Sequence, residues 1–68
     1  MIAFEVQDMS CNHCVGAITR AIQAVDEDAR VEVDLPQHRV RIVPGRADAA
    51  MLAGAIEEAG YTPVAVAA

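Results

Sequence analysis

The chain has 68 residues, of which 54% are hydrophobic and 22% are charged, and its formal net charge is −5. This length allows one small domain, and the composition is typical of a globular fold rather than of a disordered chain. The negative charge argues against nucleic acid or an anionic membrane surface as a partner, and no apolar stretch is long enough to span a membrane.

The first half of the chain predicts a strand, a loop and a helix. Apolar and more polar residues alternate from Ile2 to Val6, which is typical of a strand with one buried face. Residues 8–12 have no periodicity, and residues 13–25 show helical spacing, with Ser10 as the candidate N-cap. The expected inward face of this helix consists of Val15, Ile18, Ile22 and Val25.

The acidic run Asp26–Asp28 follows this helix. Three neighbouring carboxylates could bind a cation, but we interpret the run as a solvated loop. Alternation then resumes over residues 29–34 and 39–43, and the turn between them has the length of a hairpin. Charges of opposite sign on the outward faces of these two strands are expected to pair across the hairpin.

A second helix is expected between Asp48, its candidate N-cap, and Ala59, with Gly60 as a left-handed stop. Its expected inward residues are Leu52, Ala55, Ile56 and Ala59. A last strand over residues 62–66 contains Pro63, which suits a sheet edge, and residues 65–68 are expected to fray.

The order of these elements predicts the fold. Strand, helix, strand, strand, helix, strand is the order of the ferredoxin-like α+β fold. In this fold a four-stranded antiparallel sheet carries both helices on one face and leaves its other face open, which agrees with the one-sided alternation of the strands.

Cys11 and Cys14 are the two cysteines of the chain, and they lie where the first loop becomes the first helix. Random placement would give this separation in about 3% of cases. Near a helix N-terminus, where unpaired N–H groups and the helix dipole favour the thiolate, two such sulfurs can bind one soft cation or form a disulfide. Two thiolates suit Cu(I) better than structural zinc, which requires four ligands.

Two other interpretations of the cysteines remain open. They could be unrelated buried residues, although their neighbours are polar and loop-like. They could instead be a redox dithiol, but enzymes of that kind need a larger fold and a cis-proline loop, for which neither Pro36 nor Pro44 is an obvious counterpart.

The stretch from Met9 to Cys14 reads M-S-C-N-H-C, and Gly60-Tyr61 closes the second helix. These residues resemble the M-x-C-x-x-C domain of the heavy-metal-associated family, which comprises small copper chaperones and amino-terminal domains of copper-transporting P-type ATPases. The likeness extends over residues 1–68, which we interpret as a single heavy-metal-associated domain.

This resemblance implies a cytoplasmic copper chaperone rather than an enzyme. Cys11 and Cys14 would hold one Cu(I) and pass it by thiolate exchange to the metal-binding domain of a copper-transporting P-type ATPase, or to a copper-responsive regulator. The N-terminus has no secretory signal, and cytoplasmic thiols stay reduced. Elements that are complete from Met1 favour a chaperone that stands alone, and an ATPase domain is the alternative.

The resemblance also implies roles for residues around the cysteines. Met9 would anchor the loop in the core, and Tyr61 would screen or hydrogen-bond the thiolates. Ser10 stands where zinc-transporting relatives carry an acidic residue. His13 is expected to face solvent, and ligation by it would require a dimer that shares copper, or Zn(II).

Three further expectations concern the loop and its surroundings. Many family members have glycine where this chain has Asp8, a hard ligand that would shift preference toward zinc. Glu57 and Glu58 are expected to form an acidic docking face beside the loop. His38 is interpreted as a surface residue.

Overall fold

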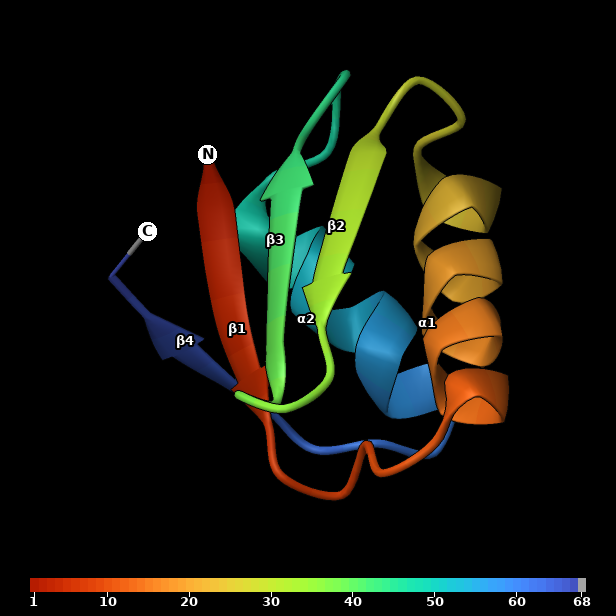
Figure 1. Cartoon of the computed structure of the whole chain (residues 1–68). Coiled ribbons are helices and arrows are strands. Elements are labelled where there is room, and N and C mark those ends of the chain that lie inside the picture. Colours follow the sequence, from red (N-terminus) through yellow and green to blue (C-terminus); the bar gives the residue numbers. More distant parts are fainter. Residues whose placement is uncertain (68) are drawn as a thin grey trace.

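The structure is a computed structural model that describes residues 1–67. Its elements are β1 (Ile2–Val6), α1 (Asn12–Val25), β2 (Arg30–Asp34), β3 (Arg39–Val43), α2 (Ala49–Glu58) and β4 (Pro63–Val66). The four strands form one antiparallel sheet in the order β2-β3-β1-β4. In Figure 1, α2 lies behind the strands and α1 stands next to β2. The predicted ferredoxin-like fold is therefore confirmed.

The core lies between the sheet and the helices. Its fully buried side chains come from the strands, from both helices and from the loop after β1, and they are Val6, Met9, Ile18, Ile22, Val40, Ile42, Leu52 and Ile56. Phe4 is the one aromatic side chain among the buried residues. A core made of so few side chains depends strongly on each of them, because truncation of one buried Leu or Ile costs about 2–5 kcal/mol.

The inward face of α1 is narrower than predicted. Ile18 and Ile22 are buried and Val15 is partly buried, but 46% of Val25 is exposed. Val25 is the last residue of the helix, and there its side chain lines an open groove between α1 and α2 rather than the core. The prediction that Val25 faces inward is thus wrong.

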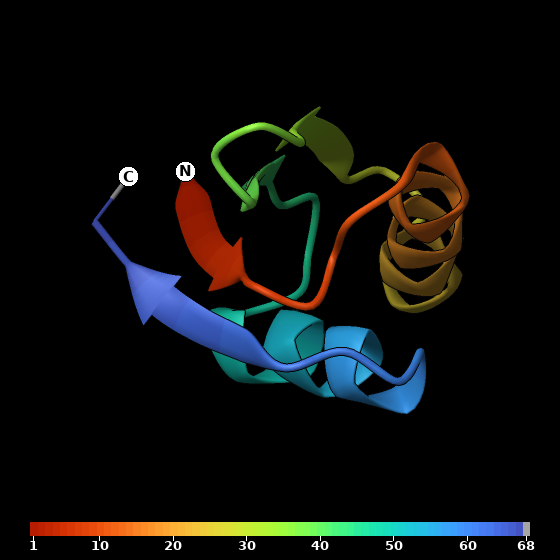
Figure 2. The same cartoon turned by 60° about the horizontal axis from the view of Figure 1, so that its bottom comes forward.

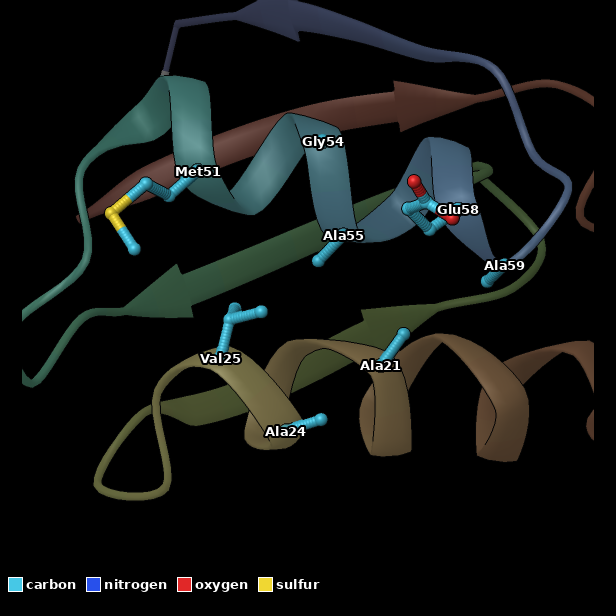
Figure 3. Close-up of a pocket in the computed structure, with 8 residues that line it drawn as sticks. All are labelled: Ala21, Ala24, Val25, Met51, Gly54, Ala55, Glu58 and Ala59. Atoms are coloured by element: carbon cyan, nitrogen blue, oxygen red, sulfur yellow. The ribbon is translucent and has the colours of Figure 1, made fainter.

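The groove between the two helices has a volume of about 550 Å³. Small residues line most of it, namely Ala21, Ala24, Gly54, Ala55 and Ala59. Figure 3 shows Val25 and Met51 toward one end and Glu58 near the other.

No helix within residues 1–67 is both long enough and apolar enough to cross a bilayer.

The hairpin of β2 and β3 shows the predicted charge pairing. Glu32 stands opposite Arg41 in the register, and a 3.4 Å contact joins their side chains. Because this pair is largely exposed, it contributes at most about 1 kcal/mol. Asp34, opposite Arg39, instead accepts a hydrogen bond from the backbone N–H of Gln37.

The interpretation of residues 26–28 as a solvated loop is wrong for Asp26. Only 4% of Asp26 is exposed, and its Oδ2 atom accepts hydrogen bonds from the backbone N–H groups of Gly45, Arg46 and Ala47 at 2.8, 2.9 and 2.9 Å. These N–H groups, that of Ala47 above all, hold the pKa of the carboxyl below its ordinary value. Asp26 therefore ties the end of α1 to the segment between β3 and α2.

The observed ends of α2 agree with the predicted ends to within one residue. Asp48 is its N-cap, and the Oδ1 atom accepts a hydrogen bond from the N–H of Met51 at 2.9 Å. The helix ends at Glu58, one residue earlier than predicted, with Ala59 as the C-cap, and Gly60 has the left-handed φ of +96° expected of a helix stop.

The last strand is at an edge of the sheet, as Pro63 predicted. The expectation that residues 65–68 fray is wrong for residues 65 and 66, because these pair with β1 as part of β4. Ala68 lies outside the described residues.

Candidate metal site

The two cysteines lie on the loop that leads from β1 into α1, at the lower end of the molecule in Figure 1. Cys11 is exposed, and Cys14, in the first turn of the helix, is partly buried. Both are free thiols, with their Sγ atoms 3.1 Å apart. A disulfide would need about 2.05 Å, so the structure presents two reduced sulfurs side by side.

The N-cap of α1 is Cys11, and the prediction of Ser10 is wrong. Cys11 has extended backbone angles, φ −152° and ψ 166°, and its side chain makes no capping hydrogen bond. The helix starts one residue later than Ser10 would require, because the loop runs extended through Cys11. The cysteine sulfurs consequently lie at the very N-terminus, where the helix dipole favours negative charge.

Tyr61 lies close to Cys14, and each affects the titration of the other. The Tyr61 hydroxyl donates toward the Cys14 sulfur and, with a smaller contribution from the Cys11 thiol, lowers the pKa of Cys14 from 9.0 to about 7. The same interaction raises the pKa of Tyr61. The interaction therefore favours the thiolate form of Cys14.

The loop is anchored from below by Met9. Its side chain is fully buried and belongs to the core cluster, against which Cys14 and Tyr61 also pack. The backbone N–H of Met9 donates to the carbonyl of Val6 at 3.2 Å, which closes a tight turn directly after β1. The thioether of Met9 thus fills the core beneath the cysteines.

The other candidate ligands are not gathered around the sulfurs. Asp8 accepts a hydrogen bond from the backbone N–H of Thr62, and His13 is exposed. Within residues 1–67, no three His, Cys, Asp or Glu side chains come together in a way that could hold a metal ion. What the described residues offer is an open pair of sulfurs rather than a closed cage.

His38 is more than the surface residue that the sequence suggested. It is partly buried, and its Nδ1 atom lies 2.8 Å from the carbonyl oxygen of Met9. Its own carbonyl accepts a hydrogen bond from the N–H of Val6 at 2.7 Å. These contacts join residues about 30 positions apart, so no local pattern could reveal them, although a histidine ending a hairpin turn could have prompted the question.

The comparisons with known proteins agree with this geometry. The model of the heavy-metal-associated domain matches residues 3–62. Copper chaperone CopZ of Enterococcus hirae is 35% identical over 60 residues, which cover 85% of this chain and 87% of the relative. The curated CopZ of Staphylococcus haemolyticus is 34% identical over 58 residues, covering 82% and 85% of the two chains.

Solved structures are similar in fold as well as in sequence. Copper chaperone Atx1 from Synechocystis PCC6803 is 34% identical, with a TM-score of 0.90, and the match covers 94% of this chain and all of the other. A protein of Agrobacterium tumefaciens is 42% identical, with a TM-score of 0.79, and covers 88% and 92% of the two chains. With the family model spanning most of the sequence, this chain belongs to the heavy-metal-associated domain family.

Proposed function

We propose that this protein is a copper chaperone in which Cys11 and Cys14 bind one Cu(I) and pass it on. The observation that carries the proposal is the pair of reduced sulfurs, 3.1 Å apart and accessible at the surface. Two soft thiolates are well suited to Cu(I), which accepts low coordination numbers. The two CopZ relatives and Atx1, which are 34–35% identical to this chain, are named copper chaperones, which supports the same assignment.

Binding requires the sulfurs to separate. At metal–sulfur distances of about 2.3 Å, the present 3.1 Å between the sulfurs would bend the S–Cu–S angle to roughly 85°. A linear arrangement needs about 4.6 Å between sulfurs. Because Cys11 is exposed and its side chain has no capping bond, rotation of Cys11 can supply this opening.

Release follows from the openness of the site. An incoming thiolate of the partner can bond to the copper before a bond to Cys11 or Cys14 breaks, since within residues 1–67 no third His, Cys, Asp or Glu side chain completes a metal-binding group with the two sulfurs. Each new copper–sulfur bond replaces an old one, and the displaced cysteine takes up a proton. Copper can therefore move between proteins without entering water, whereas a four-ligand cage would hold it.

We propose that the recipient is the metal-binding domain of a copper-transporting P-type ATPase or a copper-responsive regulator, in the cytoplasm. Glu57 and Glu58 are exposed at the end of α2, which Figure 1 places at the same end of the molecule as the cysteine loop. With a net charge of −5, this face suits a basic partner. Such association is fast, weak and salt-sensitive.

The test is competition with a Cu(I) chelator under reducing conditions, with Zn(II) measured in parallel. We expect one Cu(I) per chain in preference to zinc, and loss of tight binding in Cys11→Ser and in Cys14→Ser. Ser10→Ala, in the same loop, is the matched control and should bind like the natural protein. Size-exclusion chromatography with copper then distinguishes a monomer from a copper-bridged homodimer.

Two results would overturn the proposal. One is a reduced protein that does not bind Cu(I), and the other is binding that survives removal of both sulfurs. Reduction of insulin by a protein that fails to bind copper would instead identify a redox dithiol.

A further inference from the structure

His38, in the turn between β2 and β3, contacts the loop that carries the cysteines. The carbonyl of His38 accepts a hydrogen bond from Val6 N–H at 2.7 Å, and the imidazole Nδ1 lies 2.8 Å from Met9 O. Val6 and Met9 are themselves the two ends of the tight turn closed by Met9 N–H and Val6 O. His38 therefore contacts both ends of this turn, whose last residue, Met9, stands two positions before Cys11.

The direction of the side-chain hydrogen bond is set by chemistry. A carbonyl oxygen can only accept, so Nδ1 carries the hydrogen and donates it to Met9 O. His38 fills the role of donor, and an acceptor at the same place would repel the carbonyl.

The backbone of His38 adds a second, independent observation. Its φ is +56°, the one positive φ of a residue other than glycine within residues 1–67. His38 N–H donates to Leu35 O at 3.1 Å, so the residue ends a tight turn at a position where hairpins favour glycine or asparagine. Glycine would adopt this conformation more easily, but it would lose the contact with Met9.

We propose that His38 is a positioning residue for the metal-binding loop. Met9 is held from below by its buried side chain and from outside by the imidazole, so the chain enters Cys11 from a fixed point. A loop ordered before binding loses less entropy when both sulfurs engage one ion. The inference rests on the proposed function in that the ion is Cu(I).

Three substitutions of His38 distinguish the effect of its side-chain donor from the effect of its backbone conformation in the turn. In His38→Asn, the amide nitrogen stands at the same number of bonds from the backbone as Nδ1, and asparagine tolerates positive φ. In His38→Asp, the side chain has nearly the same shape as that of asparagine, but it presents an acceptor to the carbonyl of Met9. His38→Gly removes the side chain and favours the turn. Gln37→Glu adds the charge of the Asp variant at an exposed position of the same turn, and is the matched control.

The primary measurement is hydrogen exchange of the Met9 amide in the metal-free protein, compared with amides of the central strands. We expect the Asp and Gly variants to exchange this proton roughly threefold to tenfold faster, as loss of one hydrogen bond implies. The Asn variant and Gln37→Glu should resemble the natural protein. A general loss of stability would instead accelerate the strand amides equally.

Cu(I) affinity is the second measurement. It should fall by roughly threefold to tenfold in His38→Asp and His38→Gly and be restored in His38→Asn. The proposal would be overturned if His38→Asp and His38→Gly both kept the Met9 exchange rate and the Cu(I) affinity of the natural protein. It would also be overturned if His38→Asn were as impaired as His38→Gly. If the natural protein bound no copper, the proposed function would fail, but exchange in the metal-free protein would still decide whether His38 positions the loop.

Discussion

The carboxylate of Asp8 accepts a hydrogen bond from the backbone N–H of Thr62, with 3.2 Å between Oδ1 and N. This bond joins the metal-binding loop to the segment after α2, 54 positions further along the chain, directly next to Tyr61. The carboxylate thus has a partner within the protein. We infer that Asp8 holds the two segments together, and we predict that it is not a metal ligand.

Substitution of Asp8 tests this inference. Asp8→Asn keeps an acceptor oxygen, so we expect Cu(I) and Zn(II) affinities within about twofold of the natural values. Asp8→Ala removes the acceptor and should accelerate hydrogen exchange of the Thr62 amide. A large loss of Zn(II) affinity in Asp8→Asn, measured by competition, would instead place the carboxylate among the ligands.

Removal of the Tyr61 hydroxyl should raise the pKa of Cys14. In Tyr61→Phe the ring still packs against the core, but the largest of the interactions that lower the pKa of Cys14 is lost, so the pKa should rise from about 7 toward 9.0. The thiolate fraction at neutral pH then falls, and alkylation of Cys14 slows several-fold. The rate of alkylation as a function of pH, measured in Cys11→Ser so that one thiol reacts, gives the pKa. An unchanged profile would exclude the hydroxyl as the cause.

Asp26 should matter for stability and not for copper. Asp26→Ala leaves three backbone N–H groups without their acceptor, and we expect the midpoint of thermal unfolding to fall by roughly 10 °C. Glu27→Ala, next to it but exposed, is the control and should change little. Equal midpoints for the two variants would contradict the assignment.

The same carboxyl predicts a pH dependence. Its pKa is lower in the folded protein than the ordinary 3.8, so the unfolded chain binds more protons in this range. The stabilisation is complete above about pH 5 and is lost progressively as the pH falls through the lowered pKa. Denaturant titrations from pH 6 downward, compared between the natural protein and Asp26→Ala, should converge at the acid end.

Charge reversal at the end of α2 tests the docking face. Glu57→Arg with Glu58→Arg should slow copper transfer to a basic partner domain at low salt, and the difference should shrink as salt screens the charges. Glu27→Arg with Asp28→Arg makes the same change in charge at the far end of α1 and serves as the control. Equal transfer rates for both pairs would remove Glu57 and Glu58 from the interface.

Local patterns predicted most of the fold because each is set by neighbouring residues. Alternation in β3, helical spacing at Ile18 and Ile22, and the cap at Asp48 each depend on residues a few positions apart. In β1 the alternation holds for Phe4 and Val6, but Ala3, expected on the outward face, is buried. Gly60 likewise needs only its own φ. Errors occurred at the ends of α1, where the start moved to Cys11 as N-cap and Val25 faced a groove.

The contacts that the sequence did not reveal are polar and distant. Asp26 finds its three donors 19 to 21 positions later, and His38 finds Met9 at a separation of 29. An acidic residue before a turn is normally solvated, and a histidine in a hairpin is normally exposed. The residue types therefore gave no indication that Asp26 and His38 would be buried or partly buried and hydrogen-bonded. Only the folded arrangement supplies the partners of Asp26 and His38, whereas the family resemblance had already suggested that Tyr61 lies beside the thiolates.

The path of β1 and β4 has a practical consequence. β1 starts, and β4 ends, at the opposite end of the sheet from the cysteine loop, as Figures 1 and 2 show. A fluorophore or a surface tether attached at either of these strand ends would leave the thiols unobstructed. Immobilised or labelled protein can therefore be used to follow the delivery of its cargo in real time.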